Sequence, residues 1–180
     1  MKRLSAICLS NVTAHSNQQS MFTLAHISDI HLSPLPEPTM RELMSKRITG
    51  YINWKKNRKS SLGSSTLDMI VAHMKAQSPD HIAVTGDLTN LSLPKELENA
   101  GEFLQSLGEP KNVSAICGNH DAYVPGALNN AIASWQPWLS GDDKPTTHVD
   151  HFPYLRVREN VAIIGCNSCL LYTSPSPRDS

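Results

Sequence analysis

The sequence predicts an α/β fold in which helices cover a largely parallel sheet. Short apolar segments with β-propensity alternate with longer stretches that have helical periodicity, and this alternation is typical of parallel sheets. Five segments are candidate strands: residues 22–28, 81–85, 113–117, 154–157 and 161–166. The last two flank a tight turn at Glu159-Asn160, which predicts a hairpin after the parallel strands.

The segment after the first strand combines a helix signal with a basic stretch. Thr39 and Glu42 have capping-box spacing, which predicts a helix that begins there, continues towards Arg47 and breaks at Gly50. Residues 51–61 then contain four basic side chains and a tryptophan. We interpret them as a solvated surface loop; the alternative is a local role at the mouth of an anion-binding cleft.

Three later stretches have the apolar spacing of amphipathic helices. The first is capped by Ser65 or Thr66, and the second is capped by Ser92 and ends at Gly108. The third is expected to stop near Pro137. The apolar positions that define these helices are Leu67, Ile70, Val71 and Met74; Leu93, Leu97, Ala100, Leu104 and Leu107; and Leu128, Ile132 and Trp135.

Composition favours one soluble globular domain. The 180 residues are 39% hydrophobic and 18% charged, which is enough apolar material for one sizeable core. The formal net charge is zero, so no overall field attracts nucleic acid, and no apolar run approaches the ~20 residues of a membrane-spanning helix. The four cysteines show no disulfide framework, which predicts a reducing, cytoplasmic environment. We interpret the C-x-x-C spacing of Cys166 and Cys169 as chance, because no second pair completes a zinc site.

Both ends of the sequence are predicted to lie outside the domain, which we place at residues 21–168. Residues 1–20 are mostly polar after a short apolar stretch, and Met21 stands directly before the first strand. We interpret Met21 as the natural start and residues 1–20 as a non-native or disordered extension. Residues 169–180 resemble one translated frame of a sequencing adapter; the alternative is a proline-rich disordered tail.

Three of the predicted strands end in side chains that bind metals. Asp29 and His31 follow the first strand, Gly86-Asp87 follows the second, and Gly118-Asn119-His120-Asp121 follows the third. Each motif alone is weak, and an isolated Asn-His-Asp is ordinarily a polar loop. Because the carboxyl ends of parallel strands meet at one edge, we expect the three motifs to form one site. Oxygen donors together with imidazole suit zinc, manganese or iron.

These motifs resemble those of the calcineurin-like metallophosphoesterase superfamily, and the resemblance covers residues 22 to about 168. The sequences Gly86-Asp87-Leu88-Thr89 and Ile27-Ser28-Asp29-Ile30-His31 are closest to the bacterial class III cyclic-nucleotide phosphodiesterase branch. Protein serine/threonine phosphatases carry further acidic and arginine residues after Gly-Asp, whereas Leu88, Thr89 and Asn90 follow here. The resemblance implies the N-terminal part of a four-layer α/β/β/α sandwich that is incomplete at the C-terminus.

The resemblance also implies a role for each motif residue in a site for two metal ions, drawn from iron, manganese and zinc. Asp29 and His31 would hold the first metal, and Asp87 would bridge both. Asn119 would hold the second metal through its amide oxygen, and His120 would protonate the leaving alkoxide as general acid. Two such cations clamp a phosphate and lower the pKa of an attacking water.

Asp121 would sit behind His120 and fix its orientation, again by resemblance. An imidazole suits the general-acid role because it titrates near neutrality. A neutral amide ligand such as Asn119 adds no negative charge against an anionic substrate.

The sequence departs from the family pattern after the third motif. The family supplies a further histidine after another strand and then Gly-His-x-His, and this chain has neither. The later histidines, His148 and His151, lack the flanking pattern, and we interpret them as surface loop. We therefore expect a second metal site that is incomplete, exposed apolar surface, and weak or absent activity in this chain.

The leading functional hypothesis is hydrolysis of a small phosphodiester, with a 3′,5′-cyclic nucleotide as the first candidate. A phosphomonoesterase and a nucleotide-sugar pyrophosphatase of the same superfamily remain alternatives. A non-catalytic scaffold on the same fold is an alternative from another class, but such relatives lose the histidine that stands here at position 120. We expect neither a nucleic-acid partner nor a membrane, and the sequence leaves the oligomeric state open.

Overall fold

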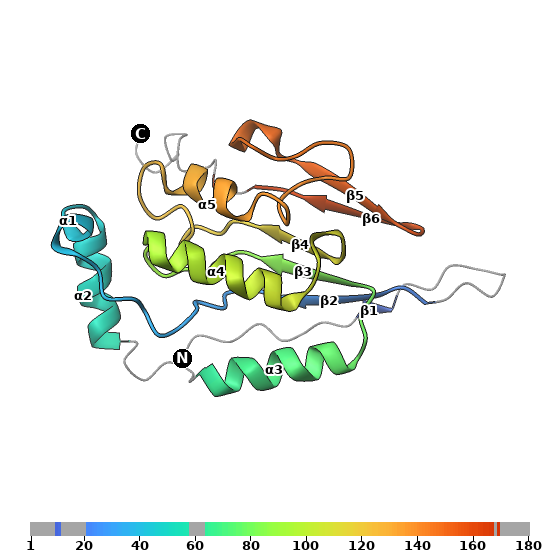
Figure 1. Cartoon of the computed structure of the whole chain (residues 1–180), viewed down its shortest axis with the longest axis horizontal. Helices are drawn as coiled ribbons and strands as arrows, with labels where there is room; N and C mark the ends of the chain where they lie inside the picture. The colour runs from blue at the N-terminus through green and yellow to red at the C-terminus, as the bar shows by residue number, and fades with distance from the viewer. Residues whose placement is uncertain (1–9, 12–20, 58–63, 168, 170–180) are drawn as a thin grey trace, which may run out of the picture.

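A computed structural model describes residues 10–11, 21–57, 64–167 and 169. Its central sheet has the strand order β1-β2-β3-β4 (Figure 1). The strands β2 (Thr23–Ile27), β3 (His81–Thr85) and β4 (Val113–Ile116) are parallel, and β1 (Ser10–Asn11) is antiparallel to β2. The prediction of a mainly parallel sheet with helical crossovers is therefore confirmed.

One face of this sheet carries the main core. Helices α3 (Ser64–Ala76), α4 (Pro94–Leu107) and α5 (Ala127–Trp135) lie in the same order as the strands (Figure 1). Alternate strand residues point to this face, since side chains on a strand alternate between its two sides. Its buried members include Ala25, Ile27, Ile82, Val84, Val113, Ala115, Met74, Leu97, Leu104, Ile132 and Trp135. The three amphipathic helices predicted from apolar spacing are confirmed.

The other face of the sheet is more polar. Its residues include His26, whose Nε2 lies 2.7 Å from Thr85 Oγ1, and His81, whose Nε2 lies 2.7 Å from Ser114 Oγ. His81 is fully buried, and its Nδ1 has no hydrogen-bond partner. Burial is the main reason that the pKa of His81 is lowered to about 4, and the nearby arginines of the hairpin add to it.

The region between β2 and α3 differs from the prediction. The capping box is present: Glu42 N donates to Thr39 Oγ1 (3.3 Å) and Thr39 N donates to Glu42 Oε2 (2.7 Å). However, α1 (Met40–Leu43) ends after four residues, and α2 (Arg47–Asn57) runs through Gly50. The predicted break at Gly50 is wrong, and so is the surface loop predicted from residue 51, of which residues 58–61 lie outside the described part.

The glycine at position 50 is explained by close packing rather than by helix termination. A Cβ at this position would lie 2.7 Å from Leu91 Cδ2 and closer still to the Tyr123 hydroxyl. The glycine therefore allows α2 to approach the loops that follow β3 and β4. Beside this contact, Tyr51 and Trp54 pack on a small cluster formed by Leu35, Leu91 and Leu93.

The start of α4 also corrects a prediction. The N-cap position is Leu93, and the buried carboxylate of Glu96 accepts from the backbone N–H groups of Asn90, Leu91 and Leu93 at 2.7, 3.0 and 3.0 Å. Ser92 is not the cap, because its hydroxyl donates to the carbonyl of His120 (2.6 Å). The serine that looked like a helix signal thus connects two loops.

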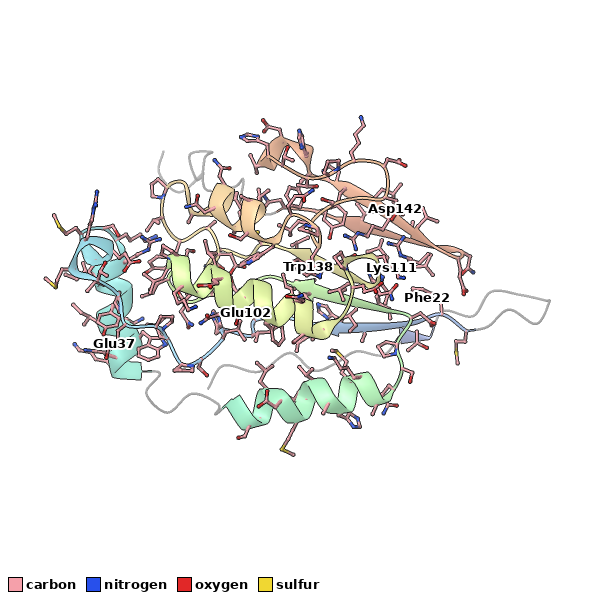
Figure 2. All side chains as sticks on the ribbon, in the orientation of Figure 1. Phe22, Glu37, Glu102, Lys111, Trp138 and Asp142 are labelled. Atoms are coloured by element: carbon pink, nitrogen blue, oxygen red, sulfur yellow. The ribbon has the colours of Figure 1, made fainter. Side chains whose placement is uncertain are left out.

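The predicted hairpin is present as β5 (Tyr154–Arg158) and β6 (Val161–Gly165), beside β4 (Figure 1). Arg156 is 3% exposed and donates to the carbonyls of Ser140 (2.6 Å), Val113 (2.7 Å), Pro137 (2.9 Å) and Pro110. Arg158 contacts the Lys111 carbonyl and the Asp142 carboxylate, and both partners are labelled in Figure 2. These arginines attach the hairpin to the segment around β4.

Exposed apolar side chains are present, as expected. Leu155, Val157 and Ile164 of the hairpin are 49%, 54% and 61% exposed and lie on its face opposite Arg156. None of the described helices is long and apolar enough to cross a bilayer.

The structure describes a short strand and one cysteine within the terminal segments that the sequence analysis places outside the domain. The short strand β1 pairs with β2, and Cys169 is buried, with its Sγ 3.1 Å from the Gly118 carbonyl oxygen. The thiol pKa of Cys169 is raised to about 11, chiefly by burial. The interpretation of these segments as non-native remains a prediction.

Candidate metal centre

The ends of β2, β3 and β4 meet at one edge of the sheet, and backbone hydrogen bonds connect them. Asp29 N donates to the Gly86 carbonyl (3.2 Å), and His31 N donates to the Asp87 carbonyl (2.9 Å). In turn, His120 N donates to Asp87 Oδ1 (2.8 Å). Asp87 therefore contacts both other motifs, the first through its backbone carbonyl and the third through its carboxylate.

Three potential ligands converge at this edge. His31, Asp87 and His120 each offer one ligand atom, and these atoms all lie within 4.8 Å of one another. The rings of His31 and His120 meet edge to face, with centroids 4.7 Å apart. One carboxylate and two imidazoles form a donor set that suits a first-row divalent metal ion.

Backbone carbonyls fix the tautomer of both histidines. Nδ1 of His31 lies 3.0 Å from the Thr89 carbonyl oxygen, and Nδ1 of His120 lies 2.8 Å from the Asn90 carbonyl oxygen. A carbonyl can only accept, so Nδ1 carries the hydrogen and Nε2 of the neutral ring has the lone pair. This outer hydrogen bond is the arrangement expected of histidines that use Nε2 for a metal or a proton.

The backbone is strained where the motifs meet. Asp29, His31 and Asp87 have positive φ values of 54°, 47° and 52°. Such conformations cost of order 1–3 kcal/mol each for non-glycine residues and cluster at functional sites. The glycines reduce crowding: a Cβ on Gly86 would lie 2.7 Å from Gly118 Cα, and one on Gly118 would lie 2.8 Å from Asp87 Cγ.

Asp121 holds the loop rather than the imidazole ring. Its fully buried carboxylate accepts from Gly118 N, Thr89 N and Thr89 Oγ1, each at 2.9 Å. Burial raises its pKa to about 6; these hydrogen bonds oppose the rise and the charge of Asp87 adds to it. The predicted contact behind His120 is thus replaced by backbone contacts, and the Asn90 carbonyl orients the ring.

Asp29 and Asn119 occupy more open positions than the three converging residues. Asp29 is exposed and accepts from Ser28 Oγ at 2.8 Å, and it does not belong to the group within 4.8 Å. Asn119 is exposed at the turn between Gly118 and His120. Their assignment as metal ligands remains a prediction.

Sequence reasoning missed several residues that support the site. Tyr123 stacks on His120, with ring centroids 5.8 Å apart and planes inclined by 26°. Arg47 donates to the carbonyls of Leu91 (2.9 Å) and Ser92 (2.6 Å) and so attaches α2 to the loop after β3. No local pattern marks Arg47, because its contacts join segments more than 40 residues apart. Tyr123 lies only three residues from His120, but no recognised motif marks it.

The two later histidines lie in the loop before the hairpin. His148 and His151 are exposed around the short 3₁₀ helix Val149–His151, and His148 Nδ1 lies 3.0 Å from an Asp150 carboxylate oxygen. Their interpretation as surface residues is confirmed.

Comparison with family models assigns the class of protein. Residues 22–168 match the calcineurin-like phosphoesterase model, which covers most of the chain. The chain therefore belongs to the calcineurin-like phosphoesterase family, whose members are metal-dependent phosphoester hydrolases. Neither the curated proteins nor the solved structures that were compared gave a match.

Proposed function

We propose that this protein hydrolyses a small phosphodiester at a centre for two metal ions. The observation that carries the proposal is the convergence of His31, Asp87 and His120 within 4.8 Å at the carboxyl ends of three strands. Asp29 and His31 would hold the first ion, Asp87 would bridge, and Asn119 would hold the second. Bound metal ions would neutralise phosphate charge and lower the pKa of an attacking water.

His120 is the proposed general acid. In its charged form the ring has two N–H groups, and the one at Nδ1 is held by the Asn90 carbonyl at 2.8 Å. The N–H at Nε2 is then directed by the same constraint and donates its proton to the departing alkoxide. The Asn90 carbonyl thus fixes the orientation of the ring that a general acid needs.

The substrate proposal is narrower and rests on the sequence motifs. Gly86-Asp87-Leu88-Thr89 supports a 3′,5′-cyclic nucleotide as the first candidate. The neutral overall charge supports a small phosphoester rather than nucleic acid. The absence of a disulfide framework in the sequence supports a cytoplasmic setting. Phosphomonoesters and nucleotide-sugar pyrophosphates are the alternatives of the same chemistry, while retention of His120 speaks against a non-catalytic scaffold.

A metal-dependent assay tests this function. The purified chain, with added Mn²⁺, is tested against bis-p-nitrophenyl phosphate, cyclic AMP and p-nitrophenyl phosphate. Because the second metal site is expected to be incomplete, weak metal-dependent turnover of a diester is expected, with loss in Asp87→Asn and no change in His148→Asn, an exposed histidine outside the site. Turnover of p-nitrophenyl phosphate alone would identify a monoesterase, and no turnover of any substrate would refute the catalytic proposal for this chain.

Metal content gives a second readout that does not depend on turnover. Mass spectrometry of the metal-loaded chain should find a tightly bound ion that Asp87→Asn releases and His148→Asn retains. The sequence further predicts that the second ion binds weakly, because Asp87 and Asn119 are the only ligands that the motifs supply for it. Two tightly bound ions per chain would contradict that prediction.

A further inference from the structure

A lysine ammonium stands close to the proposed general acid. Nζ of Lys46 lies 5.2 Å from the centroid of the Tyr123 ring, and that ring stacks on His120 at 5.8 Å. Among the described residues, no carboxylate forms an ion pair with Lys46. A cation held over an aromatic ring therefore borders the site without a protein counter-charge.

Contacts of neighbouring residues fix the position of the Lys46 backbone. Its neighbour Arg47 donates to the Leu91 and Ser92 carbonyls at 2.9 and 2.6 Å. One turn further along α2, Gly50 packs against the Tyr123 side chain. Tyr123 N in turn donates to Ser92 Oγ at 3.3 Å. The start of α2 and the ring of Tyr123 are thus fixed to the same loop, and the exposed Lys46 side chain extends from that fixed point.

The charge of the surrounding element favours an anion. The segment from α1 to α2 has five basic side chains and a single acidic one, whereas the whole chain has a net charge of zero. A local excess of one sign raises the concentration of oppositely charged ligands near it. The basic residues of this segment are Arg41, Lys46, Arg47, Lys55 and Lys56, and the acidic one is Glu42.

We propose that Lys46 binds a second anionic group of the substrate, on the side from which the leaving group departs. This inference rests on the proposed function, in which His120 protonates the leaving oxygen. A leaving group that departs beside His120 passes Tyr123, and one that carries its own phosphate also reaches the ammonium of Lys46. A cyclic nucleotide has a single phosphate and would leave this position unused. The inference therefore favours, within the phosphoesters of the proposed function, those whose leaving group itself bears a phosphate.

Two small probes distinguish binding at the metal centre from binding of a second anionic group at Lys46. Pentylphosphonate has a single phosphonate, and pentane-1,5-diphosphonate adds a second one on the same carbon chain. Binding of each to the Mn²⁺-loaded protein is measured by titration calorimetry. An exposed ion pair contributes up to ~1 kcal/mol, so the second phosphonate should tighten binding to the native chain about fivefold.

Lys55 provides a matched control. Its Nζ lies 4.8 Å from the Tyr51 ring centroid on the same helix, so Lys55→Gln removes the same charge from a similar contact. The fivefold gain should disappear in Lys46→Gln, persist in Lys55→Gln and be retained in Lys46→Arg. Lys46 is exposed, so its replacement leaves the core intact.

The possible failures are distinguishable. If the native chain binds neither probe in the presence of Mn²⁺, the proposed function fails together with this inference. If it binds pentylphosphonate but gains nothing from the second phosphonate, the inference alone is overturned. The same holds if the gain survives in Lys46→Gln or is lost equally in Lys55→Gln.

Discussion

Replacing Glu96 by glutamine tests how the loop after β3 controls both histidines. The Glu96 carboxylate is 4% exposed and accepts from the N–H groups of Asn90, Leu91 and Leu93 at 2.7, 3.0 and 3.0 Å. The Thr89 and Asn90 carbonyls, at the start of the same loop, hold the rings of His31 and His120. Glu96 therefore supports the groups that orient two site residues.

The size of the effect follows from the number of acceptors. Glutamine has one carbonyl oxygen, so at best it keeps the two bonds of Oε2 and turns its NH₂ group towards Asn90 N–H. One charge-assisted hydrogen bond is lost, two N–H donors face each other, and the remaining bonds become neutral. Because charge-assisted bonds contribute roughly 1.5–3 kcal/mol, we expect Glu96→Gln to lower the free energy of unfolding by about 3 kcal/mol.

Urea denaturation of Glu96→Gln and Glu98→Gln measures this difference. Glu98 lies on the same helix, is exposed and pairs with Lys95 at 2.7 Å, so its replacement should cost less than ~1 kcal/mol. Tightly bound metal should also decrease in Glu96→Gln but not in Glu98→Gln. If the two variants unfold at the same urea concentration and retain equal metal, the loop does not depend on Glu96 as argued.

Three further predictions concern packing and charge outside the metal cluster. Gly50→Ala should be less stable than Gly101→Ala by about 2 kcal/mol in urea unfolding. A Cβ at position 50 would overlap Leu91, whereas a Cβ at position 101 would meet Trp135 at an ordinary 3.7 Å. Equal stability of the two variants would show that α2 can shift to make room for the added Cβ. Arg156→Met should cost about 3 kcal/mol and lower Tm, since it leaves buried carbonyls without a donor. Arg158→Met removes the half-exposed pair with Asp142 and the bonds to the Lys111 carbonyl, which water can replace, so it should cost about 1 kcal/mol; similar losses in the two variants would contradict the buried role of Arg156. The pKa of His81 is about 4 in the folded chain against an ordinary 6.5, so between these values the unfolded chain binds a proton that the folded chain does not. The free energy of unfolding should therefore fall by up to about 3 kcal/mol as pH drops from 6.5 to 4. His81→Asn should flatten that part of the profile of stability against pH, and an unchanged slope would refute the lowered pKa of His81.

The fold was largely predictable because its signals are local. Apolar runs gave the strands, and 3.6-residue spacing gave α3, α4 and α5. The prediction failed at Gly50 and Ser92, where the residue type that commonly ends or caps a helix serves a contact between distant segments. Such contacts depend on tertiary packing, which no short stretch of sequence encodes.

For the candidate site, the sequence predicted which residues meet but not which groups hold them in place. Which residues meet followed from strand ends in a parallel sheet, and His31, Asp87 and His120 do converge. How they are held did not follow, because both rings are oriented by backbone carbonyls, and every residue has a carbonyl. The contacts of Asp121 could not be predicted for the same reason: its partners are backbone N–H groups and Thr89 rather than a titratable neighbour.

One loop connects the proposed functions of this site. Residues 89 and 90 orient the two histidines through successive carbonyls, and residues 91 and 92 receive the guanidinium of Arg47 beside Lys46. Metal binding, proton donation and recognition of a second anionic group would therefore all depend on the position of residues 89–92. A displacement of this loop should weaken all three together, whereas loss of the exposed Lys46 charge should affect recognition alone. That difference separates a substrate-binding residue from the structural frame on which it depends.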